Sequence, residues 1–119
     1  MPGKEARHTA VVVEKTYDLL LWLLPKVEKF PRGLRFSVGG RTVEVGLDLL
    51  LALLEAAYRT EKAQALEAAS RHANALRYLV RLAKDLRLLS LDSYGFAAEH
   101  IDEIGRMIGG WEKSVRSRT

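Results

Sequence analysis

The sequence contains no cysteine, which excludes disulfide bridges, thiolate metal ligands and cysteine nucleophiles. Histidine is scarce as well, with three in the chain. One of them, His100, lies among carboxylates in the segment "EHIDE", but no second histidine follows four residues later to share its helix face. We therefore expect no metal site and no cofactor.

Long apolar runs are also missing. The longest uninterrupted run is about six residues, against roughly 20 needed to span a bilayer, and the N-terminal residues carry charges with no apolar signal segment behind them. The sequence thus predicts a soluble, cytoplasmic protein without a membrane partner. With 119 residues, 48% of them hydrophobic, we expect one domain over residues 1–119.

Signatures of catalysis are absent too. The glycine pair in "VGGR" follows no strand pattern and matches no phosphate-binding fingerprint, and no nucleophile is placed beside a titratable partner. We expect a protein that is not an enzyme.

Helical periodicity is what the sequence does have. Apolar residues recur at steps of three and four in four segments, which predicts helices over residues 9–30, 34–59, 61–89 and 93–116. Thr60 and either Asp92 or Ser93 are the expected caps of the last two. Short connections predict an all-α, antiparallel up-down-up-down four-helix bundle. Residues 33–45 hold three glycines, so a β-hairpin around Gly39–Gly40 is the alternative there.

The first two segments carry more apolar residues than one core requires. In the second segment the core stripe is assigned to Val43, Leu47, Leu50, Leu54 and Ala57. The surplus predicts a second buried surface, namely a homo-oligomer interface, and the alternative is a wide core stripe. A kink at Pro25 would help to shape that surface. The candidate interface residues are Leu21, Trp22, Leu49 and Leu53.

Basic residues form two groups in a chain of net charge +4. The third segment aligns Arg77, Arg81, Lys84 and Arg87 on one helix face. The second group spans the first connection and consists of Lys26, Lys29, Arg32, Arg35 and Arg41. Its first two members share a helix face with Trp22, an aromatic that can stack on a base. The first group suits a row of phosphates or an acidic protein surface, and a solvated face is its alternative. For the second group the alternative is that Trp22 belongs to a subunit interface and the lysines form its solvated rim.

Three stretches, "YDLLLWLLPKVEKFPRGLRF", "LRYLVRLAKDLRLLS" and "IDEIGRMIGGW", together resemble the accessory variability determinant (Avd) family of diversity-generating retroelements. A related group, the four-helix proteins encoded in intervening sequences of 23S ribosomal RNA genes, shares a looser form of "KFP" and "LRYL". That group, or a structural oligomer with no nucleic-acid role, is the alternative identification.

The Avd resemblance implies a homopentamer that binds the element's reverse transcriptase and its template RNA, and so supports mutagenic cDNA synthesis without catalysing it. Carried onto this sequence, the resemblance implies that the cations of the two groups above, except Arg41, supply the basic contacts. It also implies that Gly105 and Gly109 permit close helix approach.

Overall fold

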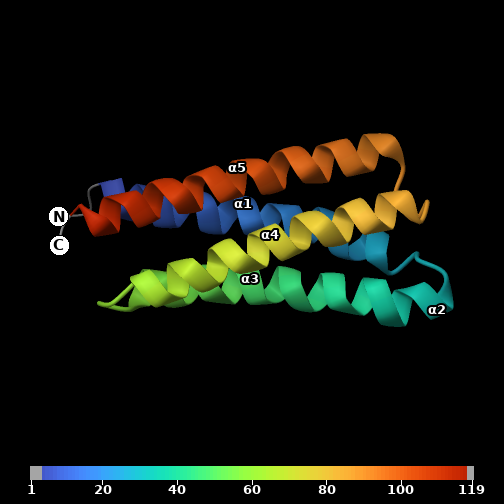
Figure 1. The fold of residues 1–119 in the computed structure, drawn as a ribbon, viewed down its shortest axis with the longest axis horizontal. Coiled ribbons are helices and arrows are strands. Elements are labelled where there is room, and N and C mark those ends of the chain that lie inside the picture. The colour runs from blue at the N-terminus through green and yellow to red at the C-terminus, as the bar shows by residue number, and fades with distance from the viewer. Residues whose placement is uncertain (1–3, 118–119) are drawn as a thin grey trace.

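The computed structural model describes residues 4–117, with side chains from residue 11 onward. All regular elements over that range are helices, joined by short connections (Figure 1). The elements, in chain order, are α1 (Lys4–Val27), α2 (Arg32–Leu34), the π-helix η1 (Arg35–Gly39), α3 (Gly40–Tyr58), α4 (Ala63–Asp85) and α5 (Leu91–Arg116).

The four long helices run antiparallel and pack side by side (Figure 1). Helix α1 packs against α3 and α5, and α4 packs against the same two helices. The connection from α1 to α3 and the connection from α4 to α5 therefore lie at one end of the molecule, and the two termini lie at the other. The all-α fold expected from the sequence is confirmed.

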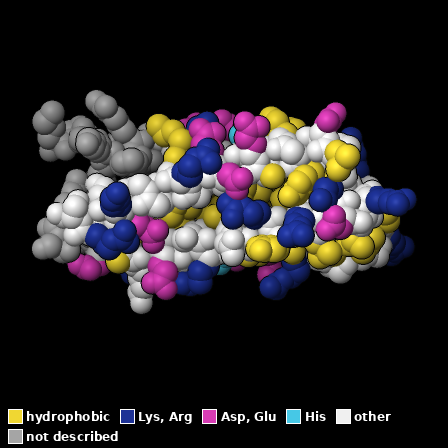
Figure 2. All heavy atoms as spheres, turned by 45° about the horizontal axis from the view of Figure 1, so that its top comes forward, with side chains coloured by type: hydrophobic (Ala, Val, Ile, Leu, Met, Phe, Trp, Pro, Cys, Tyr) yellow, Lys and Arg dark blue, Asp and Glu magenta, His cyan; other side chains and the backbone are white. Residues whose placement is uncertain are grey.

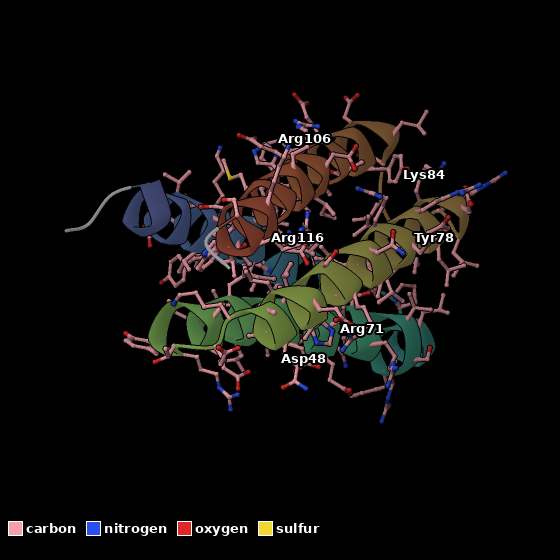
Figure 3. The ribbon with its side chains drawn as sticks, turned by 60° about the vertical axis from the view of Figure 1, so that its left-hand side comes forward. Asp48, Arg71, Tyr78, Lys84, Arg106 and Arg116 are labelled. Carbon is pink, nitrogen blue, oxygen red and sulfur yellow. The ribbon has the colours of Figure 1, made fainter. Side chains whose placement is uncertain are left out.

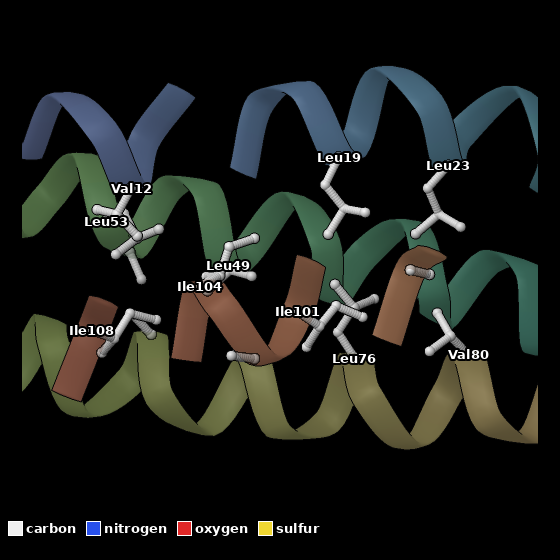
Figure 4. Close-up of a cluster of buried hydrophobic side chains, with 14 of the residues drawn as sticks. Val12, Leu19, Leu23, Leu49, Leu53, Leu76, Val80, Ile101, Ile104 and Ile108 are labelled. Atoms are coloured by element: carbon white, nitrogen blue, oxygen red, sulfur yellow. The ribbon is translucent and has the colours of Figure 1, made fainter. Parts of the chain in front are cut away.

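The core is built from aliphatic side chains of all four long helices (Figure 4). Most apolar positions that recur at steps of three and four in the first segment, among them Leu23 and Val27, are buried, and Val13 is half-buried. In the fourth segment Ile101, Ile104 and Ile108 are completely inaccessible, while Val115 near its end is half-buried. Each fully buried aliphatic side chain contributes about 1.5–3 kcal/mol relative to exposure, so these stripes hold the helices together.

The core stripe of α3 differs from the expected one. Leu49 and Leu53 are completely buried and belong to the core, so their predicted role in an oligomer interface is wrong. Conversely, Leu47, which was assigned to the core, is 41% exposed. Helix α3 is turned by roughly one residue position, about 100°, relative to the prediction.

Small residues explain this orientation. The inward face of α3 also carries Gly46, Ala52 and Ala56. A Cβ atom at Gly46 would come within 2.7 Å of the Leu20 side chain, so α1 and α3 approach closely because that position is a glycine. An assignment that counts large apolar residues cannot distinguish two such stripes on one apolar helix.

The glycine-rich stretch after Phe30 is helical, so the alternative of a β-hairpin is wrong; residues 4–117 contain no strand. The expected helix 34–59 is divided into α2, η1 and α3. Gly39 lies at the end of η1, where an added Cβ would be 2.9 Å from Val27 Cγ1 and 3.4 Å from Phe30 Cδ2. Glycine therefore lets the start of α3 pack against the end of α1.

Replacing Gly39 with alanine is expected to destabilise the protein by about 1–3 kcal/mol, because the β-branched Val27 cannot move aside easily. Gly33→Ala is the matched control, since nothing lies within 4 Å of its Cβ position. It should leave the free energy of unfolding unchanged or raise it by up to about 1 kcal/mol. Urea denaturation of both variants checks this, and equal stability of the two would contradict the account.

Helix ends also differ from the predicted ones. The cap of α5 is Ser90, whose Oγ accepts a hydrogen bond from the Ser93 N–H at 3.0 Å, rather than Asp92 or Ser93. Thr60 does not cap α4. The residue before that helix is Lys62, whose ammonium donates to the carbonyls of Ala56 and Arg59. Pro25 lies in the last turn of α1, which ends two residues later.

Candidate nucleic-acid interface

The fold brings the two basic groups of the sequence to the same end of the bundle. Segments 26–44 and 81–92 hold eight Lys and Arg against four Asp and Glu, so this end carries a cationic excess. Figure 2 shows dark-blue side chains at this end, opposite the termini. We call this region the basic end, and its cations are Lys26, Lys29, Arg32, Arg35, Arg41, Arg81, Lys84 and Arg87.

Arg77 does not belong to the basic end. It lies in the middle of α4, and its Nη2 atom forms an ion pair with Asp102 of α5 at 2.5 Å. Lys84, in the last turn of α4, contacts Asp85 at 3.2 Å and lies 4.6 Å over the Tyr94 ring of α5. Figure 3 shows Lys84 between these two helices. Both side chains therefore join α4 to α5 and are already engaged.

Arg87 leaves the predicted stripe because α4 ends earlier than expected. The helix ends at Asp85, and Arg87 adopts the left-handed conformation with φ of 63°. The Leu88 N–H donates to the Ala83 carbonyl at 2.8 Å, which closes the helix in the manner of a Schellman motif. Arg87 is consequently exposed at the tip of the molecule.

The cations of the first connection are engaged to different degrees. Lys26 lies 4.8 Å over the Trp22 ring, and Arg41 pairs with Glu44 at 3.6 Å. The guanidinium of Arg35 lies 5.0 Å from the Phe36 ring centroid, and its Nη1 also donates to the Glu28 carbonyl at 3.5 Å. The contacts of these three cations join residues of the same chain, and most of them lie at its surface.

Four cations of the basic end form no ion pair with any residue that the structure describes. They are Lys29, Arg32, Arg81 and Arg87, and all are exposed. Unpaired surface cations can neutralise phosphates without first breaking an internal contact. The sequence identified all four, but it could not separate them from the engaged cations.

A shallow hollow of about 630 Å³ lies at the basic end, between the end of α4 and the start of α5. Its lining includes Lys84, Arg87 and Leu91. The Asp85 carboxylate also lines the hollow and pairs with Lys84, so Arg87 is the lining cation left to attract a phosphate there.

From the sequence, Trp22 was singled out as an aromatic of interest, whereas Phe36 and Phe96 were not. Trp22 is half-buried against Phe96 of α5, with 4.5 Å between ring centroids, so only part of its ring is available to an oligomer partner or a base. Phe96 in turn stacks on His100 at 4.1 Å. Phe36, by contrast, is 73% exposed at the basic end. Its position between Arg35 and Ser37 in "LRFS" was the available signal.

The side chains of His100, Asp102 and Glu103 contact different neighbours. The ring Nδ1 of His100 donates to the Phe96 carbonyl at 2.8 Å, Asp102 pairs with Arg77, and Glu103 accepts from Lys15 of α1 at 3.0 Å. The hydrogen bond from Lys15 lowers the pKa of Glu103. Among the described residues, no group of three or more His, Asp or Glu side chains is arranged to hold a metal ion.

Two exposed apolar surfaces lie on the sides of the bundle. The first, here called the α1–α3 surface, consists of Tyr17, Leu21, Leu47 and Leu51. The contact between Leu20 and Gly46 sets these pairs side by side. The second, the α4 stripe, consists of Tyr78, Leu82 and Leu86 at successive turns. Leu21 is thus where the sequence predicted, while its interface role stays a prediction.

Comparison with protein-family models finds a match to the model described as bAvd-like, over residues 10–115. The chain belongs to the bAvd-like family. This match confirms the resemblance to the Avd family drawn from the sequence. Searches of the curated proteins and of the solved structures found no match. The bAvd-like match runs from α1 to α5, so it includes the basic end and both apolar surfaces.

Within the single chain, two glycines of this bAvd-like protein are not sites of close helix approach. At Gly105 the nearest atom to an added Cβ is Arg77 Nη2 at 3.9 Å, and at Gly109 nothing lies within 4 Å. Neither glycine therefore permits a close approach between helices within the described chain. No helix among the described residues is both long and apolar enough to cross a membrane.

Proposed function

We propose that this bAvd-like protein is a non-catalytic accessory protein of a diversity-generating retroelement. It binds the element's reverse transcriptase and template RNA through a basic surface and so supports mutagenic cDNA synthesis. The observation that carries the proposal is the basic end, where two connections far apart in the sequence supply eight cations against four anions. Membership of the family agrees with it.

The distribution of charge favours this end over the rest of the bundle. Along the middle, Lys15 and Arg77 are paired with carboxylates of α5, which leaves them little capacity for phosphates. At the basic end four exposed cations have no such partner within residues 4–117. A polyanion therefore gains most by contacting the tip of the bundle.

The protein acts as a homo-oligomer in this proposal, as a pentamer by the family resemblance. The support is the pair of apolar surfaces, which lie on different sides of the bundle and differ in composition. Two different surfaces on one subunit suit head-to-tail contacts, which close into a ring, rather than the self-complementary contact of a twofold dimer. A ring of parallel bundles would also gather several basic ends on one side.

Co-purification with the reverse transcriptase of the same element tests the function. We expect the tagged protein to retain the polymerase and the template RNA, and to retain the polymerase after nuclease treatment. Loss of the polymerase after nuclease treatment would show that the RNA bridges the two proteins, and it would contradict direct binding. Retention of neither partner would contradict the proposed function.

A further inference from the structure

The most exposed large apolar side chain within segments 26–44 is Phe36, on η1. Phe36 is 73% exposed and has cations near it in the sequence, with Arg32 four residues before it and Arg35 adjacent. Exposed rings set among cations are the combination with which proteins bind single-stranded nucleic acids, because every base has a face that can stack.

Exposure alone does not distinguish Phe36. Tyr58, at the opposite end of the bundle, is 87% exposed. The cation beside it, Arg59, is paired with Glu55 at 3.0 Å, and Glu61 follows closely in the chain. An anionic strand would find no cationic excess around Tyr58, whereas around Phe36 it would find Lys29 and Arg32 without ion-pair partners in the described chain.

The segment that bears Phe36 is held in place. The Arg35 N–H donates to the Pro31 carbonyl at 2.8 Å, and Ser37 Oγ donates to the Gly33 carbonyl at 3.0 Å. Gly39, three residues after Phe36, packs against Val27 of the core. The ring is therefore presented by an ordered turn, which lowers the entropy cost of binding a ligand on it.

The local geometry is also unusual. Residues Arg35–Gly39 form a π-helix, a rare arrangement that occurs frequently at functional sites. Here it follows the short helix α2 and leaves Phe36 directed away from the core, with the Arg35 guanidinium 5.0 Å from the ring centroid. The guanidinium lies over one face of the ring, and because Phe36 is largely exposed, the other face is open to a base.

We propose that Phe36 is a stacking site for an unpaired base of single-stranded RNA, with Lys29, Arg32 and Arg35 binding the flanking phosphates. The inference rests on the proposed function, because it names the form of nucleic acid that the basic end takes. A duplex cannot bind to this stacking site, because its paired bases are stacked on one another and leave no free face.

The test measures the affinity of the full-length protein for a fluorescent RNA strand of about 12 nucleotides and for the same strand annealed to its complement. Phe36→Ala should weaken single-strand binding about tenfold, the loss expected for one stacked base, and change duplex binding less than twofold. Phe36→Trp should bind the single strand about as tightly as the wild type does. The strand should quench the fluorescence of the added indole, so the loss of fluorescence should exceed that of the wild type, whose tryptophans are Trp22 and Trp111.

Tyr58→Ala is the matched control, as an exposed ring outside the basic end, and it should bind both RNAs as the wild type does. A single-stranded DNA of the same sequence shows whether the site requires ribose. If Phe36→Ala weakens binding of the DNA and of the RNA by the same factor, the result supports base stacking without ribose recognition. Circular dichroism melts check that the variants fold.

The proposal would be overturned by unchanged single-strand affinity of Phe36→Ala, or by equal losses for strand and duplex. It would also be overturned if this variant bound RNA normally but released the reverse transcriptase, since Phe36 would then be an anchor for protein. These results leave the proposed function standing. If the wild type bound neither RNA, the RNA half of the proposed function would fail together with the stacking site.

Discussion

Replacing Lys29, Arg32, Arg81 and Arg87 together with glutamine is expected to weaken RNA binding by roughly 100-fold or more near 0.1 M salt. These four cations carry no internal ion pair among the described residues, so their loss removes phosphate contacts and breaks no contact of the fold. Thermal stability should accordingly stay close to that of the wild type.

Salt dependence gives this prediction a second readout. Each phosphate contact with a single strand contributes about 0.7 to the slope of log affinity against log salt concentration. The quadruple variant should therefore show a slope smaller by about 3. Fluorescence anisotropy at several salt concentrations measures both the affinity and the slope.

The control is a variant with the same change in net charge away from the basic end. Arg59, Arg71, Arg106 and Lys113, replaced with glutamine, provide it. Arg59 and Arg71 pair with glutamates of their own helices, and the four lie outside both basic segments. If this control lost as much affinity as the first variant, net charge alone would govern binding and the basic end would have no special role.

Glutamate in place of both Leu21 and Leu51 is expected to dissociate the oligomer into monomers while each subunit remains folded. These side chains are 60% and 59% exposed in the single chain, so the substitutions do not disturb its core. In an assembled interface they would bury two unpaired carboxylates, each costing several kcal/mol. Sedimentation velocity of the wild type and the variant measures the effect.

Leu91→Glu serves as the control, because Leu91 is exposed but belongs to neither apolar surface. It should sediment as the wild type does. A wild type that sediments as a 13.4 kDa monomer at micromolar concentration would contradict the oligomer, and an oligomeric double variant would show that the α1–α3 surface is not the interface.

The helices could be predicted from the sequence because their apolar period is strong over many turns. In α1 and α5 most inward positions carry a large aliphatic or aromatic residue, such as Leu23 or Ile104, so one stripe stands out from its neighbours. The direction of the chain through the bundle followed from the short connections.

The orientation of α3 could not be predicted in the same way. Its inward face combines Leu49 and Leu53 with Gly46, whereas its outward face carries Leu47 and Leu51. Hydrophobicity is as high outside as inside, and the deciding factor is the close approach of Leu20 at Gly46, a contact between two helices. Only the packed structure contains that information.

The candidate site was predicted in composition but not in arrangement. The sequence named the cations of both groups, yet the separation of Arg77, which Asp102 engages, from Arg81 depends on which residues α5 places opposite α4. Arg87 moved because α4 ends at Asp85 in a left-handed turn without glycine, which residue preferences disfavour. Phe36 was missed because its exposure depends on the π-helix.

Photo-crosslinking shows directly whether the basic end of the bundle binds RNA. The wild-type protein would be irradiated with template RNA carrying a photoreactive uridine, digested, and its crosslinked peptides identified by mass spectrometry. The account predicts crosslinks within residues 26–41 and 81–92, the two connections at that end. Crosslinks concentrated in residues 55–67 or 106–116, toward the opposite end, would contradict it.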